Sequence, residues 1–292
     1  MRKNKVRVGI IGTGNIGSDL LRKIMRSNYL ECAIFTGRDP KSEGIRKAKE
    51  LGINTSYLSI KAIQANPDSC QIVFDATSAK THIDHSIILK KMNKFVIDLT
   101  PSRIGKMCIP VVNMTECLIE QEINMVTCGG QVAVPIIKAI ADLYPATPYA
   151  EIVGSIASKS AGIGTRDNID EYTQTTSVAI EKFAKVSKAK AIIILNPADP
   201  PITMHNTIYI EVKKPNLKLI NTAINDISRK IKKYSPGYNI AVEPIFDGKK
   251  ITLMIEVIGA GDYLPPYAGN LDIINAAAIT AAETYAKEKI LS

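Results

Sequence analysis

Residues 6–17 read Val6-Arg-Val-Gly-Ile-Ile-Gly-Thr-Gly-Asn-Ile-Gly17, an unbroken β-type run that leads into three spaced glycines. Apolar residues then recur at helical spacing between Leu20 and Met25, so the order is strand, G-x-G-x-x-G, helix. The first glycine permits a tight turn, the second lets backbone approach a pyrophosphate, and the third lets helix and strand pack closely. The helix N-terminus favours negative charge. The stretch therefore predicts a dinucleotide-binding unit, with a glycine-rich turn that holds no ligand as the alternative.

Strand-like and helical segments alternate beyond this turn. The expected strands are Glu31–Thr36, Gln71–Asp75, Lys94–Asp98, Ile109–Val112 and Glu122–Val126, and the expected helices are Lys41–Leu51 and Thr81–Lys91. This alternation predicts an α/β domain with a Rossmann-type, doubly wound parallel sheet. Small polar residues end two of the strands, at Asp75-Ala-Thr-Ser78 and Asp98-Leu-Thr-Pro101. Open α/β sheets bind their ligands at such carboxyl ends.

The second expected strand leads to a possible ribose-binding residue. An acidic residue about 20 positions beyond the glycines normally binds the adenosine ribose hydroxyls, and Asp39 lies near that register. Arg38 beside it could instead favour a 2′-phosphate, so the choice between NAD and NADP stays open. A solvated Asp-Pro turn is the alternative for both residues.

A cysteine follows the last of these strands, in Ile123-Asn-Met-Val-Thr-Cys-Gly-Gly-Gln131. At the start of a helix a thiol meets free N–H groups and the positive end of the macrodipole, which both favour the thiolate. Gly129 and Gly130 leave room for a substrate carbonyl and backbone donors. We therefore predict that Cys128 is a nucleophile, with a buried cysteine in a turn as the alternative. The strand would deliver it to the crevice that the dinucleotide occupies.

The second half of the chain has a different pattern. After an expected helix at Val132–Leu143, the expected strands are Glu151–Ala157, Ala191–Leu195, Thr207–Lys213, Ile240–Ile245 and Ile251–Ile258, and the helices are Ile169–Val186 and Leu217–Tyr234. An Asp247-Gly248 turn predicts a hairpin. These elements predict an α+β domain with a largely antiparallel sheet. The predicted domains are 1–130, completed by a C-terminal helix at 270–292, and 131–269.

Composition excludes several classes of protein. The 292 residues are 46% hydrophobic and 22% charged, as in ordinary globular domains. Apolar runs are too short to span a bilayer, and no signal region precedes the first strand. The net charge of +9 is spread over helical segments without interleaved aromatics, so no nucleic-acid platform is expected. Five scattered cysteines indicate free thiols in a reducing cytosol, and we expect a cytoplasmic protein without a membrane partner.

Two histidines one helical turn apart, His82 and His85, raise the question of a metal site. They lack a third ligand, and no Cys/His cluster has zinc spacing. The favoured interpretation is an ordinary exposed helix face, and no metal is expected.

Four motifs occur together, in order and at a characteristic spacing. They are Gly12–Gly17, Thr127-Cys-Gly-Gly-Gln131, Ser158-Lys-Ser-Ala-Gly162 and Tyr267-Ala-Gly-Asn-Leu-Asp272. In this combination the chain resembles acylating acetaldehyde dehydrogenases, the type partnered with a 4-hydroxy-2-oxovalerate aldolase in the catabolism of aromatic compounds. The resemblance covers essentially the whole chain. More distantly, the layout is similar to aspartate-semialdehyde and glyceraldehyde-3-phosphate dehydrogenases.

The resemblance implies a reaction and a set of contacts. Cys128 would carry an acyl thioester while acetaldehyde or another short aldehyde, coenzyme A and NAD are converted to acetyl-CoA and NADH. The implied NAD contacts, beside Gly12, Gly17 and Asp39, are Thr13, Gly14, Asn15, Ile16, Ser160, Ala161, Gly162, Ile163, Gly164, Thr165, Arg166, Asp167, Asn168 and Asn270. The resemblance also implies a homodimer or an aldolase-containing hetero-oligomer.

Two other functions remain open from the residues alone. Coenzyme A has no reliable short sequence signature, so a non-acylating or phosphorylating semialdehyde-type dehydrogenase would use the same cysteine. A dinucleotide-responsive binding protein would bind NADH without aldehyde-dependent turnover.

The chain departs from the family at one position that matters for the mechanism. In the family an aspartate follows an arginine in the segment that corresponds to Met204-His-Asn-Thr207, and this aspartate is implicated in activating the cysteine. Here the two positions read His205 and Asn206. An amide takes no proton, so either His205 is the base or the thiolate is stabilised without one. A surface residue is the alternative for His205.

Overall fold

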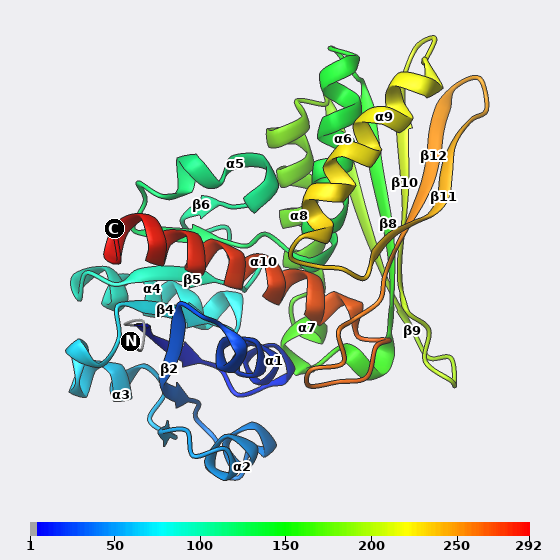
Figure 1. The fold of residues 1–292 in the computed structure, drawn as a ribbon. Helices are drawn as coiled ribbons and strands as arrows, with labels where there is room; N and C mark the ends of the chain where they lie inside the picture. Colours follow the sequence, from blue (N-terminus) through cyan, green and yellow to red (C-terminus); the bar gives the residue numbers. More distant parts are fainter. Residues whose placement is uncertain (1–4) are drawn as a thin grey trace. The chain divides into compact units, whose positions relative to one another are not determined.

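The structure, a computed structural model, describes residues 5–292, with only the backbone described at Ile163 and Gly164. The chain divides into two compact units (Figure 1). Unit 1 extends to Met125 and includes Asn275–Ser292, whereas unit 2 is Val126–Ile274. Cys128 therefore belongs to unit 2 and the glycine motif to unit 1.

Unit 1 is built on a parallel sheet. Within the described residues the sheet has seven strands in the order β3-β2-β1-β4-β5-β7-β6, and every pair is parallel. The strands are β1 (Val6–Ile11), β2 (Leu30–Thr36), β3 (Thr55–Ser56), β4 (Ile72–Asp75), β5 (Phe95–Asp98), β6 (Lys106–Met107) and β7 (Glu122–Asn124). The strand order reverses at β1/β4, which is where doubly wound folds bind ligands. The predicted Rossmann-type sheet is confirmed.

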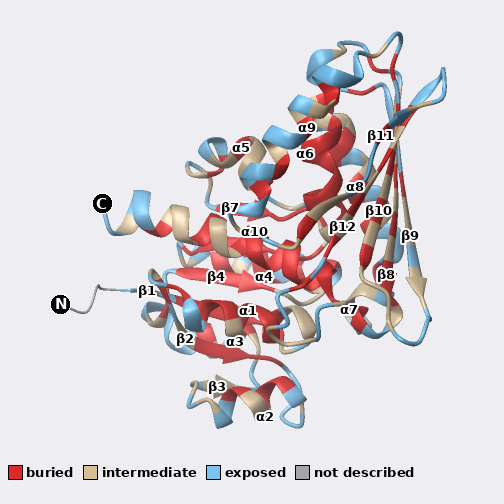
Figure 2. Cartoon of the chain, turned by 45° about the vertical axis from the view of Figure 1, so that its right-hand side comes forward, coloured by how far each residue is buried: buried red, intermediate tan, exposed pale blue. Residues whose placement is uncertain are grey.

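The helices of unit 1 connect these strands. They are α1 (Asn15–Arg26), α2 (Glu43–Glu50), α3 (Ile60–Ala65), α4 (Ala79–Lys91) and α5 (Pro110–Cys117), with a 3₁₀ turn at Pro67–Ser69. Strand β4 is buried on both faces, as its red colour in Figure 2 shows, and β1 is buried except at Arg7. The strand expected at Ile109–Val112 is wrong. Pro110 instead begins α5, because proline fits the first turn of a helix, where its missing N–H has no partner to lose.

The C-terminal residues complete unit 1. Helix α10 (Gly269–Tyr285) continues as a π-helix at Ala286–Ile290. The Asn275 amide donates to the Ile16 carbonyl (3.1 Å) and to Asp19 (2.8 Å) in α1. Tyr285 stacks on Phe95 of β5 with ring centroids 3.6 Å apart. Helix α1, which follows the glycine motif, is thereby fixed by the end of the chain.

Unit 2 contains a mixed sheet with helices on one face. Within the described residues it has five strands in the order β11-β12-β10-β8-β9, of which only the β8–β9 pair is parallel. The strands are β8 (Tyr149–Ala157), β9 (Lys188–Asn196), β10 (Met204–Glu211), β11 (Tyr238–Phe246) and β12 (Lys250–Val257). Helices α6 (Cys128–Leu143), α8 (Ile169–Ala184) and α9 (Leu217–Lys232) cover one face (Figure 1). The largely antiparallel second sheet is confirmed.

Side-chain burial alternates along β10 because neighbouring residues point to opposite faces of a sheet. Met204, Asn206 and Ile208 are buried, whereas His205 and Thr207 are only partly buried. The predicted hairpin joins β11 and β12, with Gly248 in the left-handed region at φ 91°. Among the described residues no helix combines the length and apolarity needed to cross a membrane.

Candidate active site

The glycine motif forms the turn between β1 and α1. Gly12 has φ 115°, and a Cβ there would lie 2.4 Å from the Ala76 carbonyl oxygen. A Cβ on Gly17 would lie 1.8 Å from the Gly12 carbonyl oxygen. A Cβ on Gly14 would meet no atom within 4 Å. Packing thus requires the first and third glycines, whereas the second borders open space, and a dinucleotide phosphate at that point stays a prediction.

The start of α1 suits an anion. Gly14 caps the helix without a side-chain hydrogen bond, and the first turn has no acidic residue. Thr13 is held by the Ser42 hydroxyl, which donates to its Oγ1 (2.8 Å). Asp39 is exposed after β2, and its carboxylate accepts the Lys41 N–H (2.8 Å). These residues fit the phosphates and ribose of NAD.

Sequence reasoning missed two glycines that bring the β2–α2 segment close to Thr13. A Cβ on Gly37 would lie 2.7 Å from the Thr13 side chain, and one on Gly44 would lie 2.2 Å from its carbonyl oxygen. Both glycines stand outside any recognisable motif, so only the three-dimensional approach of the two segments reveals them.

The second set of expected cofactor contacts lies in the loop after β8. This loop contains a 3₁₀ turn (Ser158–Ser160) and the short α7 (Ile163–Arg166). The Arg166 guanidinium donates to the carbonyls of Ala161 (3.1 Å) and Ser158 (2.9 Å), so it holds the loop together.

The remaining residues of this set differ in exposure. Ser160 and Asn168 are buried, and Asp167 is exposed. The side chain of Ile163 and the surroundings of Gly164 are outside what the structure describes. Asn270 is buried, and its Oδ1 has no hydrogen-bond partner among the described residues. Because the loop and Asn270 belong to unit 2, their contact with a dinucleotide stays a prediction.

Cys128 is the first residue of α6, one turn earlier than the expected helix start. The Thr127 hydroxyl caps the helix by accepting the Gly130 N–H (2.9 Å), and it lies 2.7 Å from the Thr176 hydroxyl of α8. Val126 has φ 61°. A β-branched residue in this region is strained, and such strain gathers at functional sites. The sequence carries no sign of it.

A tyrosine on α8 contacts the cysteine. The Cys128 Sγ lies 3.6 Å from the Tyr172 hydroxyl oxygen, and the Gly129 N–H donates to the same oxygen (3.0 Å). A Cβ on Gly129 would lie 2.2 Å from that oxygen, so only glycine admits the hydroxyl. Cys128 itself is partly exposed, whereas Tyr172 is buried. The space that Gly129 leaves is thus taken by the phenol, and room there for a substrate carbonyl stays a prediction.

Among the residues that the structure describes, no charged side chain contributes to the pKa of the Cys128 thiol. Burial raises the pKa of the Cys128 thiol, and hydrogen bonds with Tyr172 and with the N–H groups of Gly129 and Cys128 oppose this without reversing it. The position at a helix N-terminus was expected to favour the thiolate. The difference arises because loss of solvation outweighs the backbone donors.

Asn206 lies on the covered face of β10, near the same tyrosine. It is fully buried, and neither amide atom has a hydrogen-bond partner among the described residues. Its Oδ1 is 3.0 Å, and the Tyr172 hydroxyl 3.9 Å, from the point where a Cβ on Gly154 would stand. The missing side chain at Gly154 thus leaves a space that the amide and the phenol both border.

His205 lies on the opposite face of the strand from Asn206. Its Nδ1 is 3.1 Å from the Thr203 carbonyl oxygen, and its Nε2 is 3.8 Å from the Glu256 carboxylate. The structure brings Asn206, but not His205, to the Tyr172 side of the sheet.

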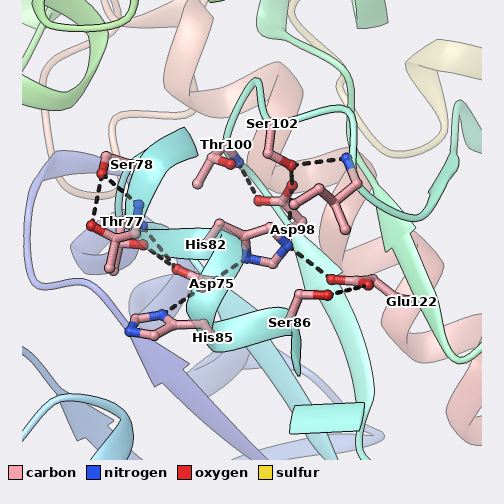
Figure 3. A network of polar contacts seen from close by, with 12 residues as sticks. Asp75, Thr77, Ser78, His82, His85, Ser86, Asp98, Thr100, Ser102 and Glu122 are labelled. Atoms are coloured by element: carbon pink, nitrogen blue, oxygen red, sulfur yellow. Dashed lines mark hydrogen bonds and ion pairs between the residues drawn. The ribbon is translucent and has the colours of Figure 1, made fainter. Parts of the chain in front are cut away.

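A second polar cluster, which we call the His82 network, is buried in unit 1 (Figure 3). His82 Nδ1 lies 2.8 Å from Asp75, and its Nε2 lies 2.8 Å from Glu122 and 3.4 Å from Asp98. His85 Nδ1 also bonds Asp75 at 2.8 Å. The exposed helix face expected for the two histidines is wrong. Asp75 ends the strand before α4, whereas Asp98 and Glu122 come from later strands, and sequence spacing does not show that the three carboxylates converge on α4.

Opposite charges meet in the His82 network, and the Lys90 ammonium adds a further ion pair with Glu122 at 2.7 Å. Burial opposes a charge on His82, but hydrogen bonds with Asp75 and Glu122 prevail and raise its pKa to about 10. Burial likewise opposes ionisation of Asp75, yet the two histidines hold the pKa of that carboxyl well below its usual range. Burial raises the pKa of Asp98 to about 6. Among the described residues no group of three His, Cys, Asp or Glu side chains is arranged to hold a metal.

The polar residues that end β4 and β5 are largely hydrogen-bonded within the His82 network. Asp75 accepts the Thr77 hydroxyl (2.6 Å), and Asp98 accepts the Thr100 N–H (2.7 Å) and the Asn124 amide (2.6 Å). These residues shape the carboxyl edge of the sheet from within.

Comparison with known proteins places the chain among dehydrogenases. A family model described as prokaryotic acetaldehyde dehydrogenase, dimerisation, matches residues 128–265, and one described as semialdehyde dehydrogenase, NAD binding domain, matches residues 7–114. An acetaldehyde dehydrogenase of Geobacillus stearothermophilus is 52% identical over 289 residues, covering 98% of both chains. One of Carboxydothermus hydrogenoformans is 53% identical over 285 residues, covering 98% of this chain and 95% of the relative.

A solved structure shares the fold at low sequence identity. Aspartate semialdehyde dehydrogenase II of Vibrio cholerae superposes with a TM-score of 0.66 over 98% of this chain and 100% of the other, at 12% identity. With close relatives matching nearly end to end, the chain belongs to the acetaldehyde dehydrogenase family, and residues 7–114 form its NAD-binding domain.

Proposed function

We propose that the protein oxidises acetaldehyde, or another short aldehyde, to the acyl thioester of coenzyme A, with NAD as the oxidant. The observation that carries this proposal is the partly exposed thiol of Cys128 at the start of α6, held between Tyr172 and backbone N–H groups. The 52% identical relative is named acetaldehyde dehydrogenase, which supports the aldehyde substrate. A covalent thioester requires such a thiol.

The first step adds sulfur to carbon. The Cys128 thiolate attacks the aldehyde carbonyl carbon, a C–S bond forms, and the carbonyl π electrons move to oxygen. The carbon then loses hydride and becomes a thioester; bound NAD supplies the hydride acceptor. The thiol of coenzyme A attacks the thioester and displaces Cys128. The overall balance is aldehyde, coenzyme A and NAD⁺ to acyl-CoA, NADH and a proton.

We propose that the Asn206 amide donates a hydrogen bond to the carbonyl oxygen of the aldehyde. Its amide is buried with unused donors and an unused acceptor, and it borders the same space as Tyr172. Leaving a buried amide unpaired costs free energy, which a substrate oxygen that accepts an N–H would recover. A fixed amide donor stabilises the negative charge that develops on the carbonyl oxygen. We assign His205 no role in the reaction, because its side chain lies on the opposite face of β10 from Asn206 and Tyr172.

NAD is assigned to the glycine turn of unit 1. Gly12 and Gly17 shape the turn, the space beside Gly14 fits a phosphate, and Asp39 suits the ribose hydroxyls. The contacts proposed for the Ser160–Asn168 loop and for Asn270 are supported by the resemblance and, for Asn270, by its unpartnered Oδ1.

The direct test is formation of NADH from acetaldehyde and NAD, with and without coenzyme A. The proposal predicts sustained turnover only when coenzyme A is present. Turnover with phosphate in its place would identify a phosphorylating enzyme, and turnover in water alone a hydrolytic one. NADH binding without any turnover would leave a dinucleotide-responsive binding protein. Repeating the assay with NADP shows which cofactor is preferred, and so whether Asp39 or Arg38 determines the choice.

We further propose a homodimer formed through the second sheet. The matching family model is described as a dimerisation domain, and Ile194 of β9 and Ile245 of β11 are exposed apolar residues on this sheet. An aldolase partner is supported by the motif resemblance alone. Light scattering of the purified protein, alone and mixed with a 4-hydroxy-2-oxovalerate aldolase, tests both: a monomer contradicts the dimer, and an unchanged mass on mixing contradicts the aldolase complex.

A further inference from the structure

We infer that Tyr172 is a catalytic residue whose hydroxyl stabilises the Cys128 thiolate by hydrogen bonding, so that the site needs no carboxylate base. This inference rests on the proposed role of Cys128 as the nucleophile. The two side chains come from different helices, Cys128 from the start of α6 and Tyr172 from the first turn of α8, and they meet at 3.6 Å. That separation suits a hydrogen bond to sulfur.

The Tyr172 hydroxyl has hydrogen bonds with the Cys128 sulfur, the Gly129 N–H and the Thr127 hydroxyl. The Gly129 N–H donates to the Tyr172 oxygen at 3.0 Å and thereby fixes its position. When Cys128 is a thiol, its S–H donates to the same oxygen. When Cys128 is a thiolate, the phenol O–H donates to the sulfur instead. A hydrogen bond to a charged acceptor is stronger than one to a neutral acceptor, so the exchange of roles favours the thiolate.

The other groups around the sulfur do not replace this donor. Helix α6 contributes backbone N–H groups of Cys128 and Gly129, and β10 presents the uncharged Asn206. Among the described residues no charged side chain bonds Cys128, and His205 lies on the far face of the strand near Glu256. Tyr172 is therefore the titratable side chain that bonds the sulfur.

The thiol proton leaves to water when the thiolate forms. Burial and the neighbouring Cys128 raise the pKa of Tyr172 well above 10, so the phenol stays protonated and acts as a donor rather than as a base. Asn206 takes no proton. Cys128 is partly exposed, which gives solvent access to the departing proton.

Both helices are tied together at this point. The Thr176 hydroxyl donates to the Tyr172 carbonyl oxygen (2.7 Å) and lies 2.7 Å from the Thr127 hydroxyl, which caps α6. The pair of threonines thus fixes the phenol-bearing turn of α8 against the cysteine-bearing turn of α6. A fixed donor stabilises charge without reorganising during the reaction.

The experiment compares Tyr172→Phe with Tyr238→Phe in the full-length protein. Tyr238 is a matched control, because it is also buried and its hydroxyl also bonds α6, at the Val132 carbonyl (3.0 Å). Alkylation of Cys128 by iodoacetamide is followed against pH by mass spectrometry of the Cys128 peptide. We expect Tyr172→Phe to move the midpoint upward by about one pH unit, as loss of one hydrogen bond to a charged group predicts. Tyr238→Phe leaves the midpoint unchanged.

Activity gives a second readout of the same shift. The kcat/KM of Tyr172→Phe falls about tenfold near neutral pH and recovers above the shifted midpoint. Gly129→Ala provides an independent variant, since its Cβ would displace the hydroxyl while Tyr172 remains; it raises the midpoint too. An unchanged midpoint in both variants overturns the inference. Alkylation does not depend on turnover, so this result stays distinct from a failure of the proposed reaction, which Cys128→Ser reports.

Discussion

The Cys128 site and the His82 network are both polar, but their polar groups are used in opposite ways. In the His82 network, Asp75, His82 and Glu122 are buried, charged and paired with one another. At the Cys128 site the residue is partly exposed and its sulfur meets a phenol, while the Asn206 amide is buried with no partner among the described residues. Asp75, His82 and Glu122 are hydrogen-bonded to one another, whereas the Asn206 amide has donors and an acceptor that a substrate could use.

This difference shows why strongly shifted pKa values do not by themselves locate an active site. The pKa of His82 is raised to about 10, a large shift, yet its ring nitrogens are already occupied by carboxylates. Ion-pair networks that serve structure produce such shifts as readily as catalysis does. The unpaired amide of Asn206 is the more informative signal, because native proteins rarely leave a buried polar group unsatisfied without a reason.

Removal of the Cys128 sulfur should have the largest effect on activity and almost none on stability, which separates the Cys128 site from the His82 network. Cys128→Ser keeps the shape of the α6 terminus but replaces a strong nucleophile by a weak one. We expect coenzyme A-dependent turnover to fall by on the order of 10³-fold or more, with NADH affinity and thermal stability nearly unchanged. Steady-state kinetics, NADH fluorescence titration and thermal unfolding measure the three quantities. Substantial acylating activity in this variant would remove Cys128 from the mechanism.

The unpaired amide of Asn206 predicts the second largest effect, a loss of kcat. Asn206→Ala removes the proposed carbonyl donor, and we expect kcat to fall by about 10²- to 10³-fold. The pH midpoint of Cys128 alkylation should stay constant, because the thiolate partner is Tyr172. Equal kcat in the variant and the parent would show that the amide is merely buried.

For the His82 network the expected loss is in stability instead. His82→Gln removes the cation that Asp75 and Glu122 share but leaves Asp75 with His85 and Glu122 with Lys90, so we expect a loss of about 3 kcal/mol in free energy of unfolding, at the low end for breaking a buried pair. His205→Gln is the control, at a partly exposed histidine where the change should stay within about 0.5 kcal/mol. Urea denaturation measures both. If the two substitutions cost the same, the network is no stabilising unit.

The stabilisation by His82 should depend on pH in a defined window. The pKa of His82 is raised from 6.5 to about 10 in the folded protein, so folding strengthens its hold on the proton. Its contribution is therefore complete below pH 6.5 and declines as the pH rises toward about 10. The difference in unfolding free energy between the parent and His82→Gln should follow this curve. A difference that grows with pH would contradict the assignment.

The smallest predicted effect separates binding from folding at the glycine turn. Gly14→Ala places a Cβ in open space and keeps the backbone at φ −78°, so stability should change little. We expect NADH affinity to fall about tenfold, because a phosphate approaches at this point. Gly17→Ala instead collides with the Gly12 carbonyl and should lower the melting temperature. Unchanged NADH affinity in Gly14→Ala would place the phosphate elsewhere.

Periodicity and motif order predicted the two sheets, because alternation and turn chemistry are local properties. The Gly12–Gly17 turn and the helix after Cys128 were visible for the same reason, although that helix begins at Cys128 and not at Val132. The strand expected at Ile109–Val112 failed since an apolar run of four residues is ambiguous, and Pro110 decides for helix.

What the sequence could not show depends on residues brought together from afar. Tyr172 lies 44 positions from Cys128, and Glu122 lies 40 positions from His82. The left-handed backbone of Val126 has no sequence sign at all. Even the raised pKa of Cys128 reflects burial, which the position of a helix terminus does not reveal.

The central claim is that Cys128 carries the acyl group, and a covalent adduct tests it most directly. Enzyme is mixed with acetaldehyde and NAD without coenzyme A, quenched in acid and digested for mass spectrometry. We predict one acetyl group on the Cys128 peptide, formed together with a single equivalent of NADH and removed when coenzyme A is added. NADH formation without this adduct, or an acetyl group on a different cysteine, would contradict it.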